Sequence, residues 1–252
     1  MPQSDLNGRV AVITGASRGL GKAMALALGR AGARLALVAR DTRSLETVRT
    51  EAREAGADAE FYRADVTDEQ QVEELARNVL QRFGPVHILI NNAGINIRKN
   101  VPEFTLQEWN SVINANLTSA FLLSRAFVPH MKGLGYGRII NMTSIMSHVS
   151  LPGRAAYSAS KAGLLGFTRA LALELAPEGI SVVAISPGPF ATEMNLPLLN
   201  DPEKNAQFLA TIPLGRWGKV EDIGALVLFL CSDHAAFITG TDVLIDGGWC
   251  AR

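Results

Sequence analysis

The sequence predicts an α/β fold in which one doubly wound, seven-stranded parallel sheet carries helices on both faces. Short apolar runs alternate along the chain with longer amphipathic stretches, and most of these stretches end at glycine or proline. The apolar runs are continuous, as in strands that are covered on both faces. Strands that alternate with helical segments favour a parallel sheet, because each helix crosses back over one face of it.

Seven segments have the composition of buried strands. The first, "VAVIT", precedes a glycine-rich turn, and the last, "TDVLIDGG", lies close to the end of the sequence. The expected strands span residues 10–14, 34–39, 59–65, 86–94, 137–144, 181–188 and 241–248.

Six segments have helical character, and several carry a recognisable start or end. Asp41 is expected to cap one helix, Asp68 and Gln71 could form a capping box on the next, and Gly84 ends that helix. Residues 189–215 are rich in proline and asparagine and show no clear period, so they are expected to form a long loop. The expected helices span residues 20–32, 42–56, 67–84, 106–132, 154–176 and 220–232.

The composition is that of an ordinary globular protein, with 252 residues, 48% of them hydrophobic and 19% charged. No repeat or linker divides the chain, so we expect a single domain over residues 1–252. Lys plus Arg and Asp plus Glu are each 24, and this balance predicts neither a nucleic-acid partner nor a membrane partner. The longest apolar run, "ALVLFLC", is far shorter than the roughly 20 residues that span a bilayer. There is no apolar signal segment near Met1, and the two cysteines, Cys231 and Cys250, have no metal-binding spacing. A cytoplasmic protein without a metal site is expected.

A glycine-rich turn follows the first strand and opens the first helix. In "TGASRGLG" the glycines are Gly15, Gly19 and Gly21, and the intervening positions include Ser17, Arg18 and Leu20. Glycines allow the main chain to turn sharply and to approach a pyrophosphate closely. The helix N-terminus then offers free N–H groups to the anion, so this turn predicts a nucleotide-phosphate site.

The stretch "YSASK" places Tyr157 four residues before Lys161 on an expected helix. Residues at i and i+4 lie on one face of a helix, so the ammonium is expected to lower the pKa of the phenol. A tyrosine tuned in this way is a usable general acid or base. An isolated pair of this kind is more often two unrelated surface side chains, so the surrounding motifs have to decide.

Five motifs in order resemble the short-chain dehydrogenase/reductase family over essentially the whole chain. They are the glycine turn, "NNAG" at 91–94, Ser144, the Tyr–Lys pair and "SPG" at 186–188. The resemblance implies a Rossmann-type domain and an NAD(P)-dependent oxidoreductase that acts on a carbonyl or a secondary alcohol. Residues 1–140 would mainly bind the cofactor, and residues 141–252 would hold the catalytic residues, the substrate loop 189–215 and the last strand.

The resemblance gives four residues a catalytic role. Tyr157 would exchange a proton with the substrate oxygen, and Lys161 would lower its pKa and contact the nicotinamide ribose. Ser144 would hydrogen-bond the substrate oxygen, and Asn116 would hold a water in the proton relay.

Neighbouring residues could be mistaken for two of these four. Asn114 and Asn116 could each be a helix-surface amide, and the "NL" that follows Asn116 favours Asn116 for the catalytic role. The thirteen-residue spacing to the tyrosine favours Ser144 over Thr143 and Ser147.

The same resemblance implies the cofactor contacts. The turn in "SPGPFAT" would shape the nicotinamide site, "NNAG" would line the adenosine side, and the end of the third strand would hold the adenine. The implied contacts are Gly15, Ser17, Arg18, Gly19, Leu20, Gly21, Arg40, Asp65, Val66, Asn92, Ala93, Gly94, Tyr157, Lys161, Pro187, Gly188, Phe190 and Thr192.

The end of the second strand bears on the choice between NADP(H) and NAD(H). An acidic residue there would select NAD(H), and an arginine would accept the 2′-phosphate of NADP(H). The position has the neutral Ala39 followed by Arg40, and Arg18 adds a second cation, which favours NADP(H). NAD(H) remains the alternative if Asp41 reaches the ribose instead of capping the next helix.

Three segments are expected to form the substrate pocket: 95–104, 145–154 and the long loop. The stretches "GINIRKNVPEF", "IPLGRWG" and "DGGWCAR" resemble the gluconate 5-dehydrogenase subgroup, which acts on sugar acids. Arg98 or Lys99 could then meet a substrate carboxylate, and His148 could face the pocket. All three could equally be ordinary loop residues.

Other functions fit the same family. A 3-oxoacyl-carrier-protein reductase would carry a basic pair where this chain has Gly135 and Glu178, and a broad carbonyl reductase is also possible. A non-catalytic NADP-binding regulator would not need the complete catalytic set. The resemblance further implies a homo-oligomer, most often a tetramer, and the apolar stretches in 106–132 and 154–176 agree with a partner subunit.

Overall fold

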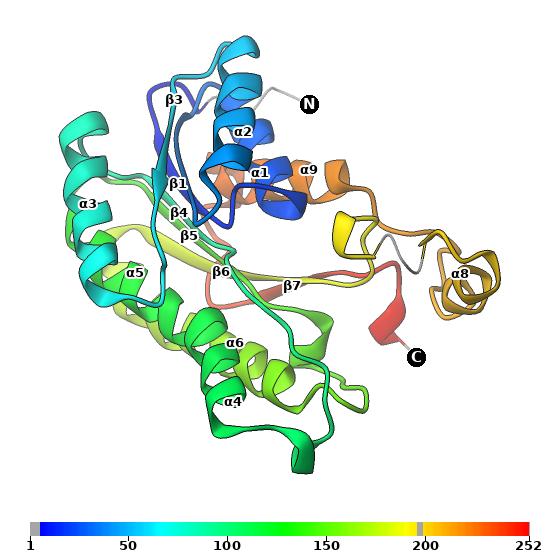
Figure 1. The fold of residues 1–252 in the computed structure, drawn as a ribbon. Coiled ribbons are helices and arrows are strands. Elements are labelled where there is room, and N and C mark those ends of the chain that lie inside the picture. Colours follow the sequence, from blue (N-terminus) through cyan, green and yellow to red (C-terminus); the bar gives the residue numbers. More distant parts are fainter. Residues whose placement is uncertain (1–5, 196–198, 252) are drawn as a thin grey trace.

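The computed structural model describes residues 6–195 and 199–251, so residues 196–198 of the expected substrate loop lie outside the described residues. Seven strands form one parallel sheet in the order β3-β2-β1-β4-β5-β6-β7 (Figure 1), and this confirms the predicted sheet. The strands are β1 (Val10–Thr14), β2 (Arg34–Ala39), β3 (Ala59–Arg63), β4 (Ile88–Asn91), β5 (Gly137–Met142), β6 (Ile180–Pro187) and β7 (Asp242–Ile245).

Helices cover both faces of this sheet. The helices α1, α2 and α9 lie on one face, and α3, α5 and α6 cover the other, with α4 on the same side as α6 (Figure 1). The bounds are α1 (Gly19–Arg30), α2 (Thr42–Glu54), α3 (Glu69–Phe83), α4 (Leu106–Ile113), α5 (Ser119–Phe127), α6 (Ala155–Leu175), α8 (Pro202–Leu209) and α9 (Val220–Cys231). Among the described residues, no helix is both long and apolar enough to cross a membrane.

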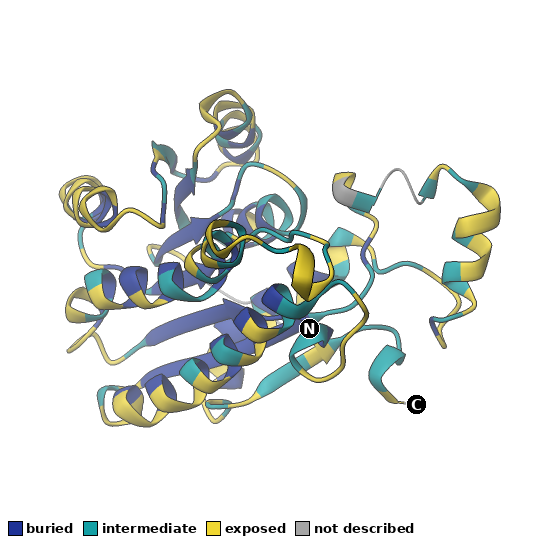
Figure 2. Cartoon of the chain, turned by 60° about the horizontal axis from the view of Figure 1, so that its bottom comes forward, coloured by how far each residue is buried: buried dark blue, intermediate teal, exposed yellow. Residues whose placement is uncertain are grey.

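Strand β1 shows why the sheet is buried on both sides. Successive side chains of a strand point to opposite faces, so Ala11 and Ile13 join the core beneath α1 and α9, whereas Val10 and Val12 join the core beneath α3 and α5. All four are at most 1% exposed. Figure 2 shows the strands buried in the middle of the molecule and the helices exposed along their outer sides.

The expected helix over 106–132 is interrupted. A π-helical turn, Asn114–Thr118, separates α4 from α5, and a 3₁₀ turn, Val128–His130, follows α5. Proline at position 129 cannot continue the α-helical hydrogen bonding, which accounts for the end of α5. The π-turn has no comparable signal in the sequence, and it lies beside the cavity described below.

The capping prediction for α3 is partly wrong. Asp68 accepts the main-chain N–H of Gln71 at 3.1 Å, as expected for an N-cap. The Gln71 side chain, however, accepts the N–H of Asp65 at 2.9 Å and does not complete a box with Asp68. The main-chain N–H of Asp68 is already donated to the carbonyl of Asp65, so the glutamine binds the other free donor.

The long loop also contains a helix that the sequence pattern did not predict. Helix α8 begins after Asp201, which caps it by accepting the N–H of Lys204 at 3.1 Å, and Pro202 occupies its first position. It stands away from the main body of the molecule (Figure 1), and none of its residues is buried. Without a buried face it shows no apolar period, so only its cap could have indicated it.

Candidate active site

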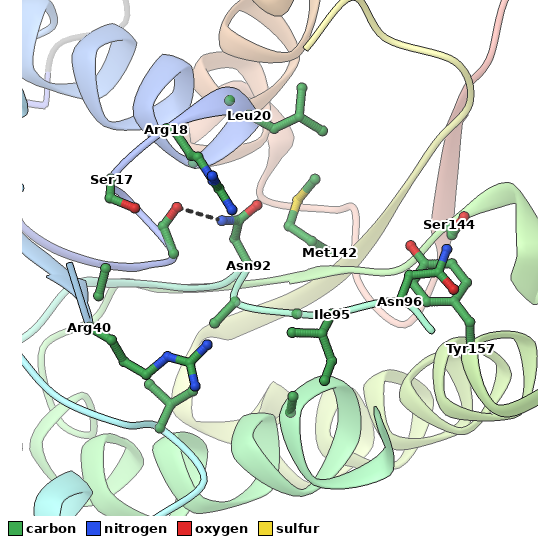
Figure 3. A pocket seen from close by; sticks show the side chains of 18 of the residues that line it. Ser17, Arg18, Leu20, Arg40, Asn92, Ile95, Asn96, Met142, Ser144 and Tyr157 are labelled. Atoms are coloured by element: carbon green, nitrogen blue, oxygen red, sulfur yellow. Dashed lines mark hydrogen bonds between the residues drawn. The ribbon is translucent and has the colours of Figure 1, made fainter. Parts of the chain in front are cut away.

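A cavity of about 1160 Å³ lies at the carboxyl ends of the strands. It is lined from the glycine turn after β1, across the ends of β2 to β4, to the ends of β5 and β6 (Figure 3). The strand order reverses direction between β1 and β4, and this is where ligands bind in doubly wound sheets. Every residue implied as a cofactor contact lines this cavity, and so does Ser144, whereas Asn116, Arg98 and His148 do not.

Close packing explains why the turn after β1 needs glycine. Gly15 has φ of +64°, and a Cβ atom on Gly21 would lie 2.2 Å from the carbonyl oxygen of Gly15. The amide of Asn92 donates to the carbonyls of Thr14 (2.8 Å) and Gly15 (3.2 Å). A dashed line in Figure 3 marks a hydrogen bond of this amide. Asn92 therefore holds the glycine turn against the end of β4, and the N-terminus of α1 faces the cavity.

Two arginines line the end of the cavity nearest β2. The Arg40 side chain is 71% exposed, and its guanidinium lies 3.6 Å from a carboxylate oxygen of Asp65. Exposed ion pairs of this kind contribute little to stability, so Arg40 can turn toward another anion at small cost. Asp41 accepts the N–H of Ser44 at 3.2 Å and its hydroxyl at 2.6 Å, which confirms that Asp41 caps α2.

Tyr157, Ser144 and Lys161 meet at the other end of the cavity. Ser144 follows β5 and is close enough to Tyr157, in the first turn of α6, for its hydroxyl to lower the pKa of the phenol. The Lys161 ammonium lies 5.7 Å from the centre of the Tyr157 ring and donates to the carbonyl of Met142 at 2.5 Å. The helix thus places the tyrosine and the lysine on one face, facing the end of β5.

The expectation that Lys161 lowers the pKa of Tyr157 is wrong in this structure. Burial raises the pKa of Tyr157, and only the hydrogen bond from Ser144 and the nearby charge of Arg154 oppose this rise. The ammonium of Lys161 is directed to the Met142 carbonyl, and burial lowers the pKa of Lys161 itself to about 8. Desolvation penalises the charged form of both groups, and in this pair it outweighs their mutual influence.

The buried lysine predicts a pH-dependent stability. The pKa of Lys161 falls from 10.5 to about 8 on folding, so the unfolded chain binds more protons between these pH values and stability rises with pH. Relative to a Lys161→Met variant, the free energy of unfolding of the wild type should rise by ~3 kcal/mol from pH 8 to pH 10.5. Urea unfolding of both proteins across this range measures the difference. If the free energy of unfolding changes equally with pH in the two proteins, the lowered pKa of Lys161 is contradicted.

Asn116 lies under the cavity floor in the π-turn and is 2% exposed. Its side chain accepts the N–H of Ile95 at 2.8 Å and donates to the carbonyl of Ile95 and to the hydroxyl of Ser160, both at 2.9 Å. A Cβ atom on Gly94 would lie 2.9 Å from its oxygen. The amide therefore anchors the segment after β4 beside Lys161, and its role in holding a relay water stays a prediction.

The three expected substrate residues differ in their surroundings. Arg98 is exposed beyond the cavity lining, and Lys99 forms an ion pair with Glu108 at 2.5 Å. The expectation that His148 faces the pocket is wrong, because its ring binds the buried carboxylate of Asp242 at 2.5 Å. The partner that holds His148 lies 94 positions away in the sequence, so no local pattern could have indicated it.

The sequence analysis missed Arg154, which lies just before α6. Its guanidinium is close enough to Tyr157 to oppose the rise in that pKa, and burial together with repulsion from Arg98 lowers the pKa of Arg154 itself. The main-chain N–H of Lys99 donates to the carbonyl of Gly153 at 3.2 Å, which joins the two loops that carry the arginines. The signal available in the sequence was the spacing, because Arg154 comes three residues before Tyr157 at the start of a helix.

The wall formed by α4 was also missed. The cavity is lined there by Asn110, Ser111 and Asn114, although Asn114 reads from the sequence as an ordinary surface amide.

Within residues 6–195 and 199–251, no group of three His, Cys, Asp or Glu side chains could hold a metal ion.

Comparison with known sequences gives the site a family. The family model for enoyl-(acyl carrier protein) reductases, which is a short-chain dehydrogenase/reductase model, matches residues 15–250. The chain is 39% identical to a 3-oxoacyl-[acyl-carrier-protein] reductase of Synechocystis sp., over 96% of this chain and 97% of the relative. It is 35% identical to a gluconate 5-dehydrogenase of Gluconobacter oxydans, over 96% of this chain and 95% of the relative.

Solved structures agree with this result. A candidate gluconate dehydrogenase from Agrobacterium tumefaciens superposes over the full length of both chains with a TM-score of 0.96 and 38% identity. A gluconate 5-dehydrogenase from Burkholderia cenocepacia, solved in complex with NADP and tartrate, superposes with a TM-score of 0.93 and 32% identity, over 99% of this chain and 98% of that one. The chain therefore belongs to the short-chain dehydrogenase/reductase family of oxidoreductases.

Proposed function

We propose that this protein is an NADP(H)-dependent oxidoreductase that interconverts a ketone and a secondary alcohol, and that its substrate carries a carboxylate, as a sugar acid does. The observation that supports this most is the continuity of one cavity. It runs from the glycine turn and the arginines Arg18 and Arg40 to the Ser144–Tyr157 pair. An extended dinucleotide would therefore place its reactive ring beside the pair that handles the substrate oxygen.

The residues present fit NADP(H). The glycine turn packs too closely for a Cβ atom at Gly21, and it brings the free N–H groups at the N-terminus of α1 to the cavity, where a pyrophosphate would bind. Arg18 and Arg40 would meet the 2′-phosphate, and Asp41 is occupied with capping α2. The Burkholderia relative is described with bound NADP, which agrees with this assignment.

The proposed chemistry assigns one task to each polar residue at the end of β5. NADP(H), when bound, supplies or accepts the hydride. Tyr157 donates a proton to the substrate oxygen in reduction and takes it back in oxidation. Ser144 binds the same oxygen, and Lys161 contacts the cofactor ribose.

The carboxylate preference rests on Arg98 and Arg154. Neither forms an ion pair with another described residue, the two guanidiniums repel each other, and Arg154 is close to Tyr157. A substrate carboxylate between them would relieve that repulsion. The relative that binds tartrate, a small dicarboxylate, supports an acidic substrate.

The main alternative is the reduction of 3-oxoacyl groups on a carrier protein, since such enzymes are among the relatives. A basic docking pair is missing at the expected places: Gly135 carries no side chain, and Glu178 is acidic and pairs with Lys132 at 3.2 Å. This favours the small-acid substrate. A 3-oxoacyl thioester, tested in the same NADPH assay, would reveal the alternative by a higher kcat/KM.

A matched pair of ketones tests the proposed substrate class. We expect a lower KM for 5-ketogluconate than for a neutral ketose of the same chain length. Arg98→Ala should raise the KM for the acid about tenfold or more, because a charge-assisted contact is worth roughly 1.5–3 kcal/mol. The KM for the neutral ketose should change little.

Arg77→Ala is the control, because Arg77 is exposed on α3 and its loss removes the same charge. Equal KM values for both ketones, unchanged in Arg98→Ala, would favour a broad carbonyl reductase. Failure to oxidise NADPH with any ketone would instead favour a non-catalytic NADP-binding regulator.

We also propose a cytoplasmic homotetramer. Several large apolar side chains are exposed on this chain, among them Leu173 on α6 (80%), Phe229 on α9 (45%) and Phe237 before β7. Burial of such side chains against a second copy would stabilise an oligomer. The free thiols Cys231 and Cys250 suit a reducing compartment. Light scattering gives the mass, and a monomer at micromolar concentration would contradict the proposal.

A further inference from the structure

A buried carboxylate, Asp242, lies one hydrogen bond away from the end of β5. Its side chain is 5% exposed and does not line the cavity. One carboxylate oxygen accepts the hydroxyl of Ser186 at 2.6 Å and lies 2.5 Å from the imidazole Nε2 of His148. The other oxygen lies 3.3 Å from the hydroxyl of Thr143. Asp242 starts β7, so the contact joins the edge strand to the loop that follows β5.

A carboxylate buried this deeply needs partners, because its ionised form is poorly solvated inside the protein. Among the described residues, no lysine or arginine forms an ion pair with Asp242, and the imidazole of His148 lies against it instead. The His148 side chain is 31% exposed, so it also connects this cluster to solvent. The chemistry proposed for Tyr157, Ser144 and Lys161 makes no use of either residue.

The cluster is connected to the main chain of Ser144. The hydroxyl of Ser186 lies 3.0 Å from the Ser144 carbonyl as well as 2.6 Å from Asp242. It carries a single hydrogen, and the shorter, charge-assisted contact to the carboxylate takes it. The hydroxyl of Thr143 lies 2.9 Å from that of Ser186 and 2.7 Å from the carbonyl of Ile185. Asp242 therefore joins the segment on both sides of Ser144 to the ends of β6 and β7.

We propose that Asp242 and His148 are positioning residues for Ser144. Asp242 contacts Thr143 and His148, on either side of Ser144, and it accepts the hydroxyl of Ser186 at the end of β6, so these contacts fix the segment that carries Ser144. Ser144 then keeps its hydroxyl in hydrogen-bond reach of Tyr157. This inference rests on the role given to Ser144 in the proposed function.

Hydrogen exchange of the cofactor-free protein tests the positioning without relying on activity. In Asp242→Asn, amide exchange in residues 142–149 should be at least tenfold faster than in the wild type, while the strands β1 and β2 stay unchanged. Asp233→Asn is the matched control, because Asp233 is 76% exposed and pairs with Arg9 away from this loop. Unchanged exchange in 142–149 would overturn the proposal. If Asp242→Asn does not fold, His148→Ala replaces it under the same criteria.

Kinetics supply the second readout. A disordered serine should lower kcat by about tenfold to a hundredfold in Asp242→Asn, with the Kd for NADPH unchanged, since small displacements of positioned groups cost this much. In His148→Gln the side-chain amide can still donate to Asp242, so kcat should stay closer to that of the wild type than in His148→Ala. Equal losses of kcat in the two variants would overturn the proposal. If the wild type reduces no ketone, the proposed function fails, whereas the exchange experiment still decides the positioning.

Discussion

Replacing Tyr157 by phenylalanine should lower kcat by about 10²- to 10⁴-fold, which is the usual contribution of a positioned general acid or base. The phenol lies close to Ser144, and the ammonium of Lys161 is 5.7 Å from the centre of its ring. The affinity for NADPH should be largely retained, because the glycine turn and Arg40 lie at the other end of the cavity. Steady-state rates and fluorescence titration with NADPH measure the two quantities separately.

Tyr62→Phe is the matched control for this substitution. Tyr62 lies in β3, and its buried hydroxyl has no hydrogen-bond partner, so its removal should leave kcat unchanged and stability equal or slightly higher. Substantial activity in Tyr157→Phe would show that another group delivers the proton. Loss of NADPH binding in the same variant would show that Tyr157 acts on the cofactor more than on the substrate.

Exchange of the residues at the end of β2 should reverse the cofactor preference. In Ala39→Asp combined with Arg40→Ser, the new carboxylate repels a 2′-phosphate and can accept a hydrogen bond from the ribose of NADH. One charge-assisted contact is worth roughly 1.5–3 kcal/mol, so the ratio of kcat/KM for NADPH to that for NADH should fall about a hundredfold or more. The measurement is kcat/KM with each cofactor at a saturating ketone concentration.

Arg43→Ser provides the control for charge, since Arg43 is exposed on α2 and does not line the cavity. In this variant the ratio of kcat/KM for NADPH to that for NADH should stay that of the wild type. A wild-type protein that already prefers NADH would contradict the arrangement in which Asp41 only caps α2. It would mean that this carboxylate leaves Ser44 and turns to the ribose when cofactor binds.

The sequence alone predicted the sheet and the cofactor end of the cavity. Strands such as β1 and β2 are continuous apolar runs, and their bounds agree with the structure to the residue. The glycine turn follows β1 directly, so its place at the carboxyl end of the sheet follows from strand direction alone. These features depend on local patterns of a few consecutive residues, and such patterns can be read without a fold.

Only the tertiary structure decided how the polar groups at the end of β5 interact. Burial, not the spacing of Tyr157 and Lys161, sets the direction of both pKa shifts. The contact of His148 with Asp242 joins residues 94 positions apart. It accounts for the absence of His148 from the cavity lining, where the sequence analysis had considered it. Desolvation and long-range hydrogen bonds depend on which segments the fold brings together, and the order of residues along the chain does not contain that information.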